Sequence, residues 1–215
     1  MLTLHTYFRS SASYRVRIAL GLKSLPYESV PVHLVRDGGE QHLPSFAAVN
    51  PAELVPVMDD SGVTLTQSLA IIEYLDEVHP QTSLLPGDAA SRARIRAISQ
   101  NVACEIHPLN NLRVLQYLES SAGMDPDARK IWYAHWVNVG FKALESMLSQ
   151  SAATGRYAHG DTPTMADCCV VPQIYNAKRY AVSMEPYPTL RRIYDTCLQL
   201  EMFQRASPEA QADMV

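Results

Sequence analysis

Two serines stand where a predicted strand gives way to a predicted helix, a position typical of sites that stabilise a bound anion. Ser10 and Ser11 follow the alternating stretch 2–6, which predicts a strand, and precede residues 12–23, which predict a helix. A hydroxyl at this point can simply cap the helix. A helix N-terminus also offers unpaired N–H groups and partial positive charge. A thiol bound there ionises more easily, and a serine can donate a hydrogen bond to its sulfur.

The turn that carries these serines contains no cysteine. It reads Ser-Ser-Ala-Ser over residues 10–13, whereas an α/β protein with its own redox chemistry would place its nucleophilic thiol there. If sulfur chemistry takes place at this turn, the sulfur must arrive with a ligand. The four cysteines lie elsewhere and form no C-x-x-C pair, so we expect reduced thiols and no metal site.

A second helix is predicted to begin near Gln67 and Ser68. Ser68 could cap this helix, or its hydroxyl and the first helix amides could hold a carboxylate with an added contact from Gln67. Just upstream, Val55 could offer free main-chain groups to a peptide-like ligand. Its neighbour Pro56, which lacks an N–H, could equally be an ordinary loop proline.

Arg113 occupies a place where the sequence pattern asks for an apolar side chain. It continues the apolar stripe of residues 95–109, with His107 and Asn110 beside it on the helical wheel, and Pro108 is expected to kink the helix. Such an arginine must be paired or must line a cleft, and the pattern does not choose between these.

Three other arginines give weaker signals. Arg179 in the stretch NAKRY, taken alone, indicates surface charge, while Arg15 and Arg17 on the first helix are expected to be structural or solvated. Thr164 and Asp167 form a capping box before a helix and are not assigned to catalysis.

The order of predicted elements indicates two domains. Residues 1–80 predict β-α-β, an irregular segment and then β-β-α, which makes a four-stranded mixed sheet with a hairpin turn at residues 59–62. Pro31 in the second strand suggests a sheet edge. Residues 81–89 predict a linker, and residues 90–215 predict an all-helical domain.

Two helices of the second domain can be placed more closely. Asp125 and Pro126 are a good N-cap and first residue for a helix. Its expected apolar stripe comprises Trp132, Trp136, Val139, Ala143 and Met147. A last helix is expected over about residues 188–200.

The composition excludes several classes of function. Of 215 residues, 47% are hydrophobic and 19% are charged, and the net charge is -4 without a long basic run, so nucleic-acid binding has little support. No apolar run approaches the roughly 20 residues of a membrane span, and the N-terminus lacks the features of a signal peptide. We therefore expect a cytoplasmic protein with no nucleic-acid or membrane partner.

Several stretches together resemble the zeta-class glutathione transferases, a family that includes maleylacetoacetate isomerase and glutathione-dependent maleylpyruvate isomerases. They span almost the whole chain in order, and the most specific are the serine turn with its R-V-R-I-A-L continuation and the H-P-L-N-N-L-R stretch. The matching stretches are YFRSSASYRVRIAL, VRDGGEQH, NPAELVPVM, TQSLAIIEYL, IHPLNNLRVLQYL, GDTPTMADCCVVPQIYNAKRY and PYPTLRRI.

The resemblance implies the glutathione transferase fold: a thioredoxin-like N-terminal domain, an all-helical C-terminal domain and a homodimer. It implies that glutathione lies along the first domain with its sulfur facing Ser10 and Ser11, and that Pro56 is cis. The residues implied to contact glutathione elsewhere are Gln67 and Ser68 at its γ-glutamyl end, Val55 at its cysteinyl backbone, Gln41 or His42 near its glycine end, and His107 and Asn111 from the second domain.

The activity implied by the resemblance is cis–trans isomerisation of a maleyl-type diacid in aromatic amino-acid catabolism. Addition of the glutathione thiolate would turn the double bond into a single bond that can rotate. Ser10, Ser11 and Arg9 are then the expected catalytic residues. Arg9, Arg113 and Arg179 are the expected partners of the substrate carboxylates, since guanidinium binds carboxylate bidentately.

Two residues depart from the family pattern: Ala12 replaces a frequent cysteine, and Tyr14 replaces a frequent tryptophan. The first change puts substrate range and rate in question. The alternatives within the family are a maleylpyruvate isomerase of gentisate degradation and a general transferase or dehalogenase. A non-catalytic binding protein and a glutaredoxin-like reductase are disfavoured by the serines present and by the missing cysteine, respectively.

Overall fold

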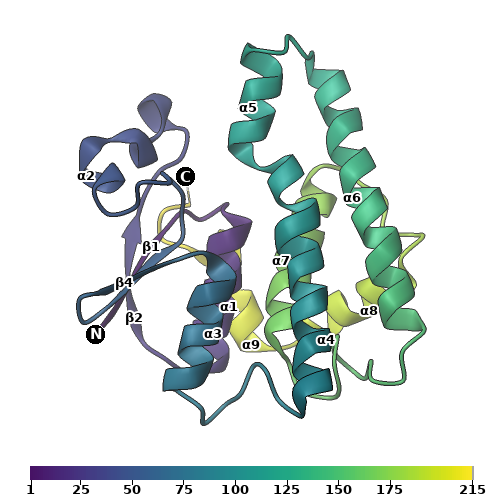
Figure 1. Ribbon diagram of the computed structural model, residues 1–215. Coiled ribbons are helices and arrows are strands. Elements are labelled where there is room, and N and C mark those ends of the chain that lie inside the picture. The colour runs from purple at the N-terminus through teal and green to yellow at the C-terminus, as the bar shows by residue number, and fades with distance from the viewer. Residues whose placement is uncertain (215) are drawn as a thin grey trace. The chain divides into compact units, whose positions relative to one another are not determined.

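Two separately packed units make up the computed structural model, which describes residues 1–214 (Figure 1). The first unit combines residues 1–85 with residues 198–214, and the second comprises residues 86–197. Among the described residues, no helix is long and apolar enough to cross a membrane. Within the same part of the chain, no group of three or more potential metal ligands comes together.

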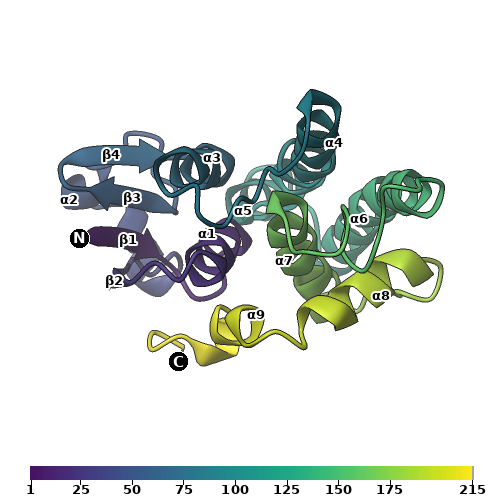
Figure 2. The same cartoon turned by 90° about the horizontal axis from the view of Figure 1, so that it is seen from below.

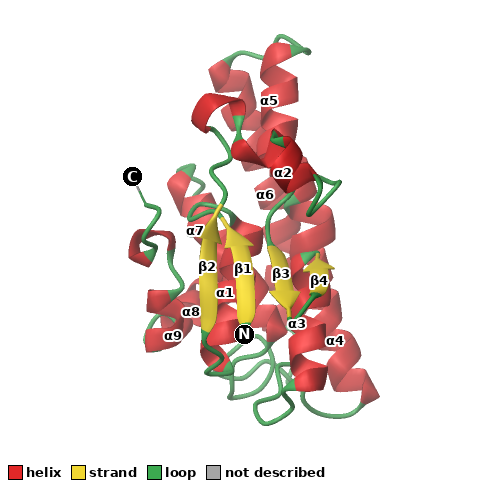
Figure 3. Ribbon diagram, turned by 90° about the vertical axis from the view of Figure 1, so that its left-hand side faces the viewer, coloured by secondary structure: helices red, strands yellow, loops and turns green. Residues whose placement is uncertain are grey.

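The first unit is built on a mixed sheet with strand order β2-β1-β3-β4 (Figure 3). β1 pairs with β2 in parallel and with β3 antiparallel, and β3 forms a hairpin with β4. Figure 2 shows helices α1 and α3 on the same side of this sheet. The elements are β1 (Leu2–Thr6), α1 (Ser11–Leu22), β2 (Tyr27–Pro31), α2 (Pro44–Ala47), β3 (Val57–Asp60), β4 (Val63–Thr66), α3 (Ser68–Val78) and α9 (Glu201–Arg205), with short 3-10 turns at Arg36–Gly38, Glu40–His42 and Pro208–Ala210.

The predicted β-α-β, β-β-α order of this unit is confirmed. Apolar alternation buries Leu2 and Leu4 of β1 against the helices, and the hairpin turns at Ser61 and Gly62. Pro31 lies on the edge strand β2, as expected from its missing N–H, although that strand is shorter than the predicted 27–34.

The chain ends in the first unit, so the expected second domain over residues 90–215 is wrong at its C-terminal end. The predicted helix 188–200 stops at Cys197, and α9 begins after the extended residue Leu200. Phe203 is fully buried, and the hydroxyl of Tyr14 donates to its carbonyl at 3.3 Å. Burial of this side chain against α1 is a tertiary effect that the local helix pattern does not contain.

The second unit is all helical, as predicted. Its helices are α4 (Ala89–Gln100), a π-helical turn (Asn101–Ile106), a 3-10 turn (Pro108–Asn110), α5 (Leu112–Ser120), α6 (Pro126–Ser149), α7 (Met165–Arg179) and α8 (Pro188–Cys197). Asp125 caps α6, and Thr164 with Asp167 forms the predicted capping box of α7. Asp167 is fully buried, and this burial raises its pKa to about 6.

The predicted apolar face of α6 is wrong. Of that stripe, Val139 is 51% exposed and Met147 is 37% exposed, and Ala143 is exposed as well. The buried face instead comprises Tyr133, Val137, Gly140, Phe141, Leu144 and Leu148. α6 carries apolar residues on more than one face, so helical periodicity alone does not choose the face that packs. A tertiary contact identifies the packed face, because Gly140 lies so close to Ile106 that any side chain at residue 140 would collide with it.

A buried cation joins the end of α1 to α3 and to the segment that follows α3. The Lys23 ammonium, on a side chain only 1% exposed, lies 2.8 Å from the Asp76 carboxylate and also donates to the carbonyls of His79 and Thr82. Burial opposes ionisation of Asp76, but hydrogen bonds from Lys23, the Leu84 amide and Ser83 outweigh it and hold its pKa below the usual value.

We predict that Lys23→Met lowers the free energy of unfolding by about 2–3 kcal/mol, because it leaves a shielded carboxylate and two carbonyls without their donor. Urea denaturation at pH 7 measures this change. Arg36→Met, which removes an exposed pair with Glu40, is the matched control and should change it by less than about 0.5 kcal/mol. Since the pKa of Asp76 is lowered on folding, its stabilising effect should persist above about pH 4 and disappear below it. Equal losses in both variants would contradict the role of Lys23.

Candidate active site

Ser10 and Ser11 lie together at the N-terminus of α1. Ser10 is the N-cap, and its Oγ accepts a hydrogen bond from the Ser13 amide at 3.1 Å. Ser11 is the first helical residue and is 5% exposed. The predicted capping role is therefore confirmed for Ser10, and it leaves the hydroxyl hydrogen able to donate. The turn places two hydroxyls and the first helix amides where an anion gains both donors and a favourable dipole.

The buried side chain of Arg17 donates hydrogen bonds to the residues that lead into this turn. Its Nη1 donates to the Thr6 hydroxyl at 3.0 Å and to the Tyr7 carbonyl at 3.3 Å, and its Nη2 donates to the Phe8 carbonyl at 3.0 Å. The side chain is 2% exposed, which confirms a structural rather than a solvated role. Burial lowers its pKa to about 10, so the guanidinium remains charged at neutral pH.

Arg9 follows directly on the same turn, with an exposed side chain. Its guanidinium lies 4.8 Å from the centre of the Phe8 ring, which orients it without using its hydrogen-bond donors. The structure thus brings Arg9, Ser10 and Ser11 together on one turn. Among residues 1–214, no hydrogen bond or ion pair engages the Arg9 guanidinium, which can therefore receive a carboxylate.

The start of α3 differs from its expected form. Ser68 does not cap the helix; it is the first helical residue, and its Oγ accepts a hydrogen bond from Arg15 Nη1 at 3.1 Å. Arg15, like Arg17, is 2% exposed. Gln67 precedes the helix with a φ of 68°, a left-handed conformation that is uncommon for a residue other than glycine. A held, unusual backbone at a helix N-terminus is typical of a ligand-binding position.

The other expected residues of the first unit separate into exposed and buried groups. Gln41 is 6% exposed, and it packs so closely on Gly39, where φ is 106°, that any side chain at that position would collide with it. His42 is exposed, and its Nδ1 lies 2.5 Å from Glu53 Oε2. Of the two alternatives for the glycine end of a ligand, His42 is therefore the more accessible. The Gln41 Oε1 atom is buried without a protein partner among the described residues.

Val55 lies beside the serine turn. It belongs to a buried cluster with Tyr7, Phe8 and Phe46, so the residues just before the serines pack against the core of the unit. The Val55–Pro56 peptide bond is cis, as the family resemblance implies.

In the second unit the expected stripe through Arg113 is wrong. The chain passes from a π-helical turn into the 3-10 turn at Pro108, breaks at the extended residue Asn111, and then begins α5. Arg113 therefore lies on a separate helix, and its side chain is exposed. The expectation that it must be paired or line a cleft, which assumed an apolar position, no longer applies. Asn111 caps α5 through the Arg113 amide at 3.1 Å, and its Nδ2 lies 3.2 Å from His107 Nε2.

Arg179 joins this region through a pair of tyrosines that sequence reasoning missed. Its guanidinium lies 4.8 Å from the centre of the Tyr180 ring, which stacks on Tyr133 with centroids 3.7 Å apart. The carbonyl of Tyr133 accepts from Asn110 Nδ2 at 3.3 Å. Burial raises the pKa of Tyr133, and Arg179 opposes that rise. The stretch NAKRY places Tyr180 directly after Arg179, but the stacking of Tyr180 on Tyr133 is a tertiary contact that no local pattern contains.

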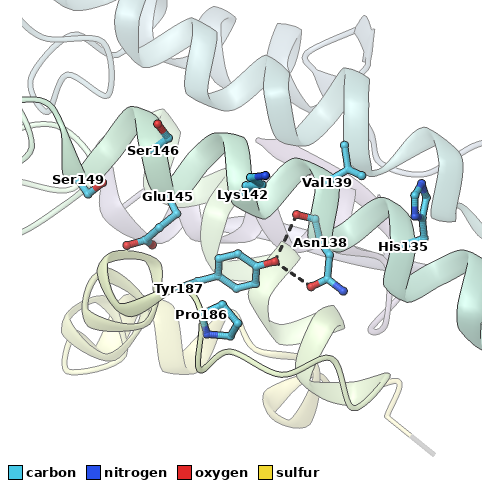
Figure 4. A pocket seen from close by; sticks show the side chains of 9 residues that line it. All are labelled: His135, Asn138, Val139, Lys142, Glu145, Ser146, Ser149, Pro186 and Tyr187. Carbon is cyan, nitrogen blue, oxygen red and sulfur yellow. Dashed lines mark hydrogen bonds between the residues drawn. The ribbon is translucent and has the colours of Figure 1, made fainter.

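A separate surface cavity between α6 and the segment before α8 is an alternative location for a site (Figure 4). Three of its polar side chains, Tyr187, Asn138 and Glu145, serve the packing of the two helices. The Tyr187 hydroxyl donates to Asn138 Oδ1 at 2.9 Å, and the Glu145 carboxylate accepts from the amides of Thr189 and Leu190. These contacts fix α8 on α6. The cavity also presents Lys142 and His135, but unlike the serine turn its described lining has no helix N-terminus with paired hydroxyls.

Comparison with known proteins places the chain among the glutathione transferases. Residues 4–83 match the family model of the glutathione S-transferase N-terminal domain, and residues 131–196 match that of the C-terminal domain. A probable maleylacetoacetate isomerase of Vibrio cholerae is 48% identical, over 99% of this chain and 98% of its own.

Solved structures extend the comparison to the fold. The holo structure of a maleylpyruvate isomerase, a bacterial zeta-class enzyme, has a TM-score of 0.96 and 45% identity, and the match covers 99% of this chain and all of the other. A maleylacetoacetate isomerase from Anaeromyxobacter dehalogenans with glutathione in its active site has a TM-score of 0.88 and 42% identity, covering all of this chain and 98% of the other.

We predict that Ser68→Ala lowers the free energy of unfolding by about 1–2 kcal/mol, because it removes an acceptor from the buried guanidinium of Arg15. Chemical denaturation measures the change. Ser45→Ala, on the exposed surface of α2, is the control and should leave the value within about 0.5 kcal/mol. If the two variants were equally stable, the contact between Arg15 and Ser68 would not support the start of α3.

Proposed function

Because this chain belongs to the glutathione S-transferase family, we propose that it is a glutathione-dependent cis–trans isomerase of a maleyl-type diacid, converting maleylacetoacetate to fumarylacetoacetate. One observation carries the proposal: Ser10 and Ser11 occupy the N-terminus of α1 in a chain whose full-length relatives are named as isomerases of this kind. The relatives support the isomerase interpretation of the sequence.

The donors of the first unit fit glutathione. The tripeptide carries an ionisable thiol and a free carboxylate near each end, and the unit offers hydroxyls and helix amides at two helix N-termini, α1 and α3. We propose that Gln67 and Ser68 hold the γ-glutamyl end, that Val55 meets the cysteinyl backbone, and that Gln41 or His42 lies near the glycine end. His107 and Asn111 are proposed as further contacts from the second unit.

Glutathione, when bound, supplies a thiolate nucleophile that adds reversibly to a carbon of the conjugated double bond. The protein then has three tasks. Ser10 and Ser11 donate hydrogen bonds to the sulfur and favour its anionic form. Arg9, Arg113 and Arg179 bind the carboxylates of the diacid and fix its orientation. The same arginines, or His107, stabilise the negative charge that develops on the carbonyl oxygen while the carbon–carbon bond rotates.

The main alternative is isomerisation of maleylpyruvate in gentisate degradation. Both substrates are cis-configured diacids with similar charge, and the relatives carry both names. A transferase or dehalogenase for neutral electrophiles is less well supported, because exposed arginines stand at the candidate site of the first unit and in the second unit. On the family resemblance we further propose a cytoplasmic homodimer that acts in tyrosine catabolism.

We predict glutathione-dependent isomerisation of maleylacetone, an analogue of maleylacetoacetate, and slower isomerisation of maleylpyruvate. Ultraviolet absorbance of each substrate, with and without glutathione, measures the reaction, and the ratio of the two kcat/KM values selects the pathway. The serine turn and arginines should together give at least about a hundredfold rate increase over glutathione alone. Turnover of neither substrate, with glutathione still bound, would contradict the isomerase assignment and leave conjugation, dehalogenation or binding.

A further inference from the structure

The last residues of the chain lie against the turn that carries the two serines. Within the first unit, Figure 2 shows α9 beside α1. Three hydrogen bonds define the contact: Tyr14 to the Phe203 carbonyl at 3.3 Å, Arg17 Nε to the Ala206 carbonyl at 3.0 Å, and the Phe8 amide to Asp213 Oδ2 at 3.0 Å.

Arg17 connects this C-terminal segment, residues 201–214, to the serine turn through a single planar group. One edge of its guanidinium donates to Thr6, Tyr7 and Phe8, while its Nε donates to Ala206. All four acceptors are neutral oxygens. The rigid fork of an arginine can meet four such acceptors at once, whereas a lysine presents a single nitrogen.

Phe8 is fixed on both sides of its backbone. Its carbonyl accepts from Arg17 and its amide donates to Asp213, so the two peptide planes that flank it are both held. The preceding carbonyl, of Tyr7, accepts from Arg17 and also from the Ser10 amide at 2.9 Å. Arg9 and Ser10 come next in the chain. Their positions are therefore set by contacts that originate in part some 200 residues away, since Phe8 and Asp213 are 205 residues apart.

We propose that the C-terminal segment positions the thiol site of this enzyme, with Arg17 and Asp213 as the two positioning residues. The proposal rests on the proposed function, because it assigns the segment to the turn that activates the glutathione thiol. Neither residue touches the reacting atoms. Their task is to keep the Ser10 hydroxyl and the first amides of α1 directed at one point.

The proposal predicts an effect on reactivity rather than on affinity for glutathione. Hydrogen bonds that stabilise a sulfur anion lose strength quickly when their donors move, so a looser turn should lower the thiolate fraction and kcat. The proposed contacts at the γ-glutamyl end, Gln67 and Ser68, belong to the start of another helix, α3, where Arg15 rather than Asp213 holds Ser68. A purely structural role would instead lower stability and leave the reactivity of each folded molecule unchanged.

The test compares Asp213→Ala with Asp213→Asn in the full-length chain. The asparagine keeps an oxygen that can accept from the Phe8 amide but loses the charge, so it should behave like the unmodified protein. We expect the alanine variant to raise the thiol pKa of bound glutathione by about half a unit to one unit and to lower kcat about five- to tenfold. Its glutathione dissociation constant should stay within about twofold. Thiolate absorbance near 240 nm against pH measures the first quantity.

Two further variants complete the test. Met214→Ala changes the neighbouring side chain, which is 50% exposed, and should leave every quantity unchanged. Arg17→Lys keeps the charge but loses the fork, and should shift the thiol pKa in the same direction as Asp213→Ala. Thermal unfolding identifies any variant that fails to fold. If Arg17→Lys fails to fold, the comparison of Asp213→Ala with Asp213→Asn still tests the positioning role.

The proposal is overturned if folded Asp213→Ala shows an unchanged thiol pKa and kcat. It is also overturned if Asp213→Asn is impaired as strongly as the alanine variant, because the hydrogen bond would then not be the cause. The thiol titration needs glutathione but no diacid. A protein that isomerises neither substrate, yet whose bound thiol pKa rises in Asp213→Ala and not in Asp213→Asn, would contradict the proposed function and support the positioning role.

Discussion

A buried guanidinium is the constraint on which the candidate active site depends. Arg17 lies inside the first unit at 2% exposure, with its hydrogen bonds directed to a hydroxyl and three backbone carbonyls. Removing a cation from water is unfavourable unless its donors are satisfied, so the oxygens of Thr6, Tyr7, Phe8 and Ala206 cannot move without leaving it unpaired. The need to keep the Arg17 donors satisfied therefore fixes the backbone that leads into the serine turn.

The stretch R-V-R on α1 supports two helix N-termini at once. Arg15 and Arg17 are two residues apart, which directs their side chains to different sides of the helix. Arg15 reaches Ser68 at the start of α3, while Arg17 reaches the turn before α1 and the C-terminal segment. The two places proposed to hold the anionic groups of glutathione are thus braced from one helix. This gives a physical reason for two buried arginines in a small domain.

Much of the fold follows from local signals in the sequence. Strand alternation, the hairpin turn, the Ser10 cap and the capping box at Asp167 were predictable, because each depends on residues close together in the chain. The features that were not predictable depend on distant partners. Ser68 accepts from Arg15 instead of capping its helix, and α9 returns to α1 because Phe203 is buried there.

The second unit shows the limits of periodicity more sharply. The stripe that led to Arg113 assumed one continuous helix, but the chain changes winding twice before it and restarts at Asn111. On α6, two apolar faces compete, and tertiary contacts such as the close approach of Ile106 to Gly140 and the packing of Phe141 on Tyr187 go with the buried one. The candidate residues themselves were mostly proposed from motifs. The motifs contained Arg17 but not its partners, and they gave no indication of the support from Tyr133 and Asp213.

The most direct test of the account is the thiol pKa of glutathione bound to the unmodified protein and to the Ser10→Ala and Ser11→Ala variants. Thiolate absorbance against pH gives the value. We expect a pKa at least about one unit below that of a free thiol, near 8.5, and a rise toward the free value when the responsible serine is removed. An unmodified protein whose bound glutathione titrates like free thiol would contradict the claim that this turn activates the sulfur.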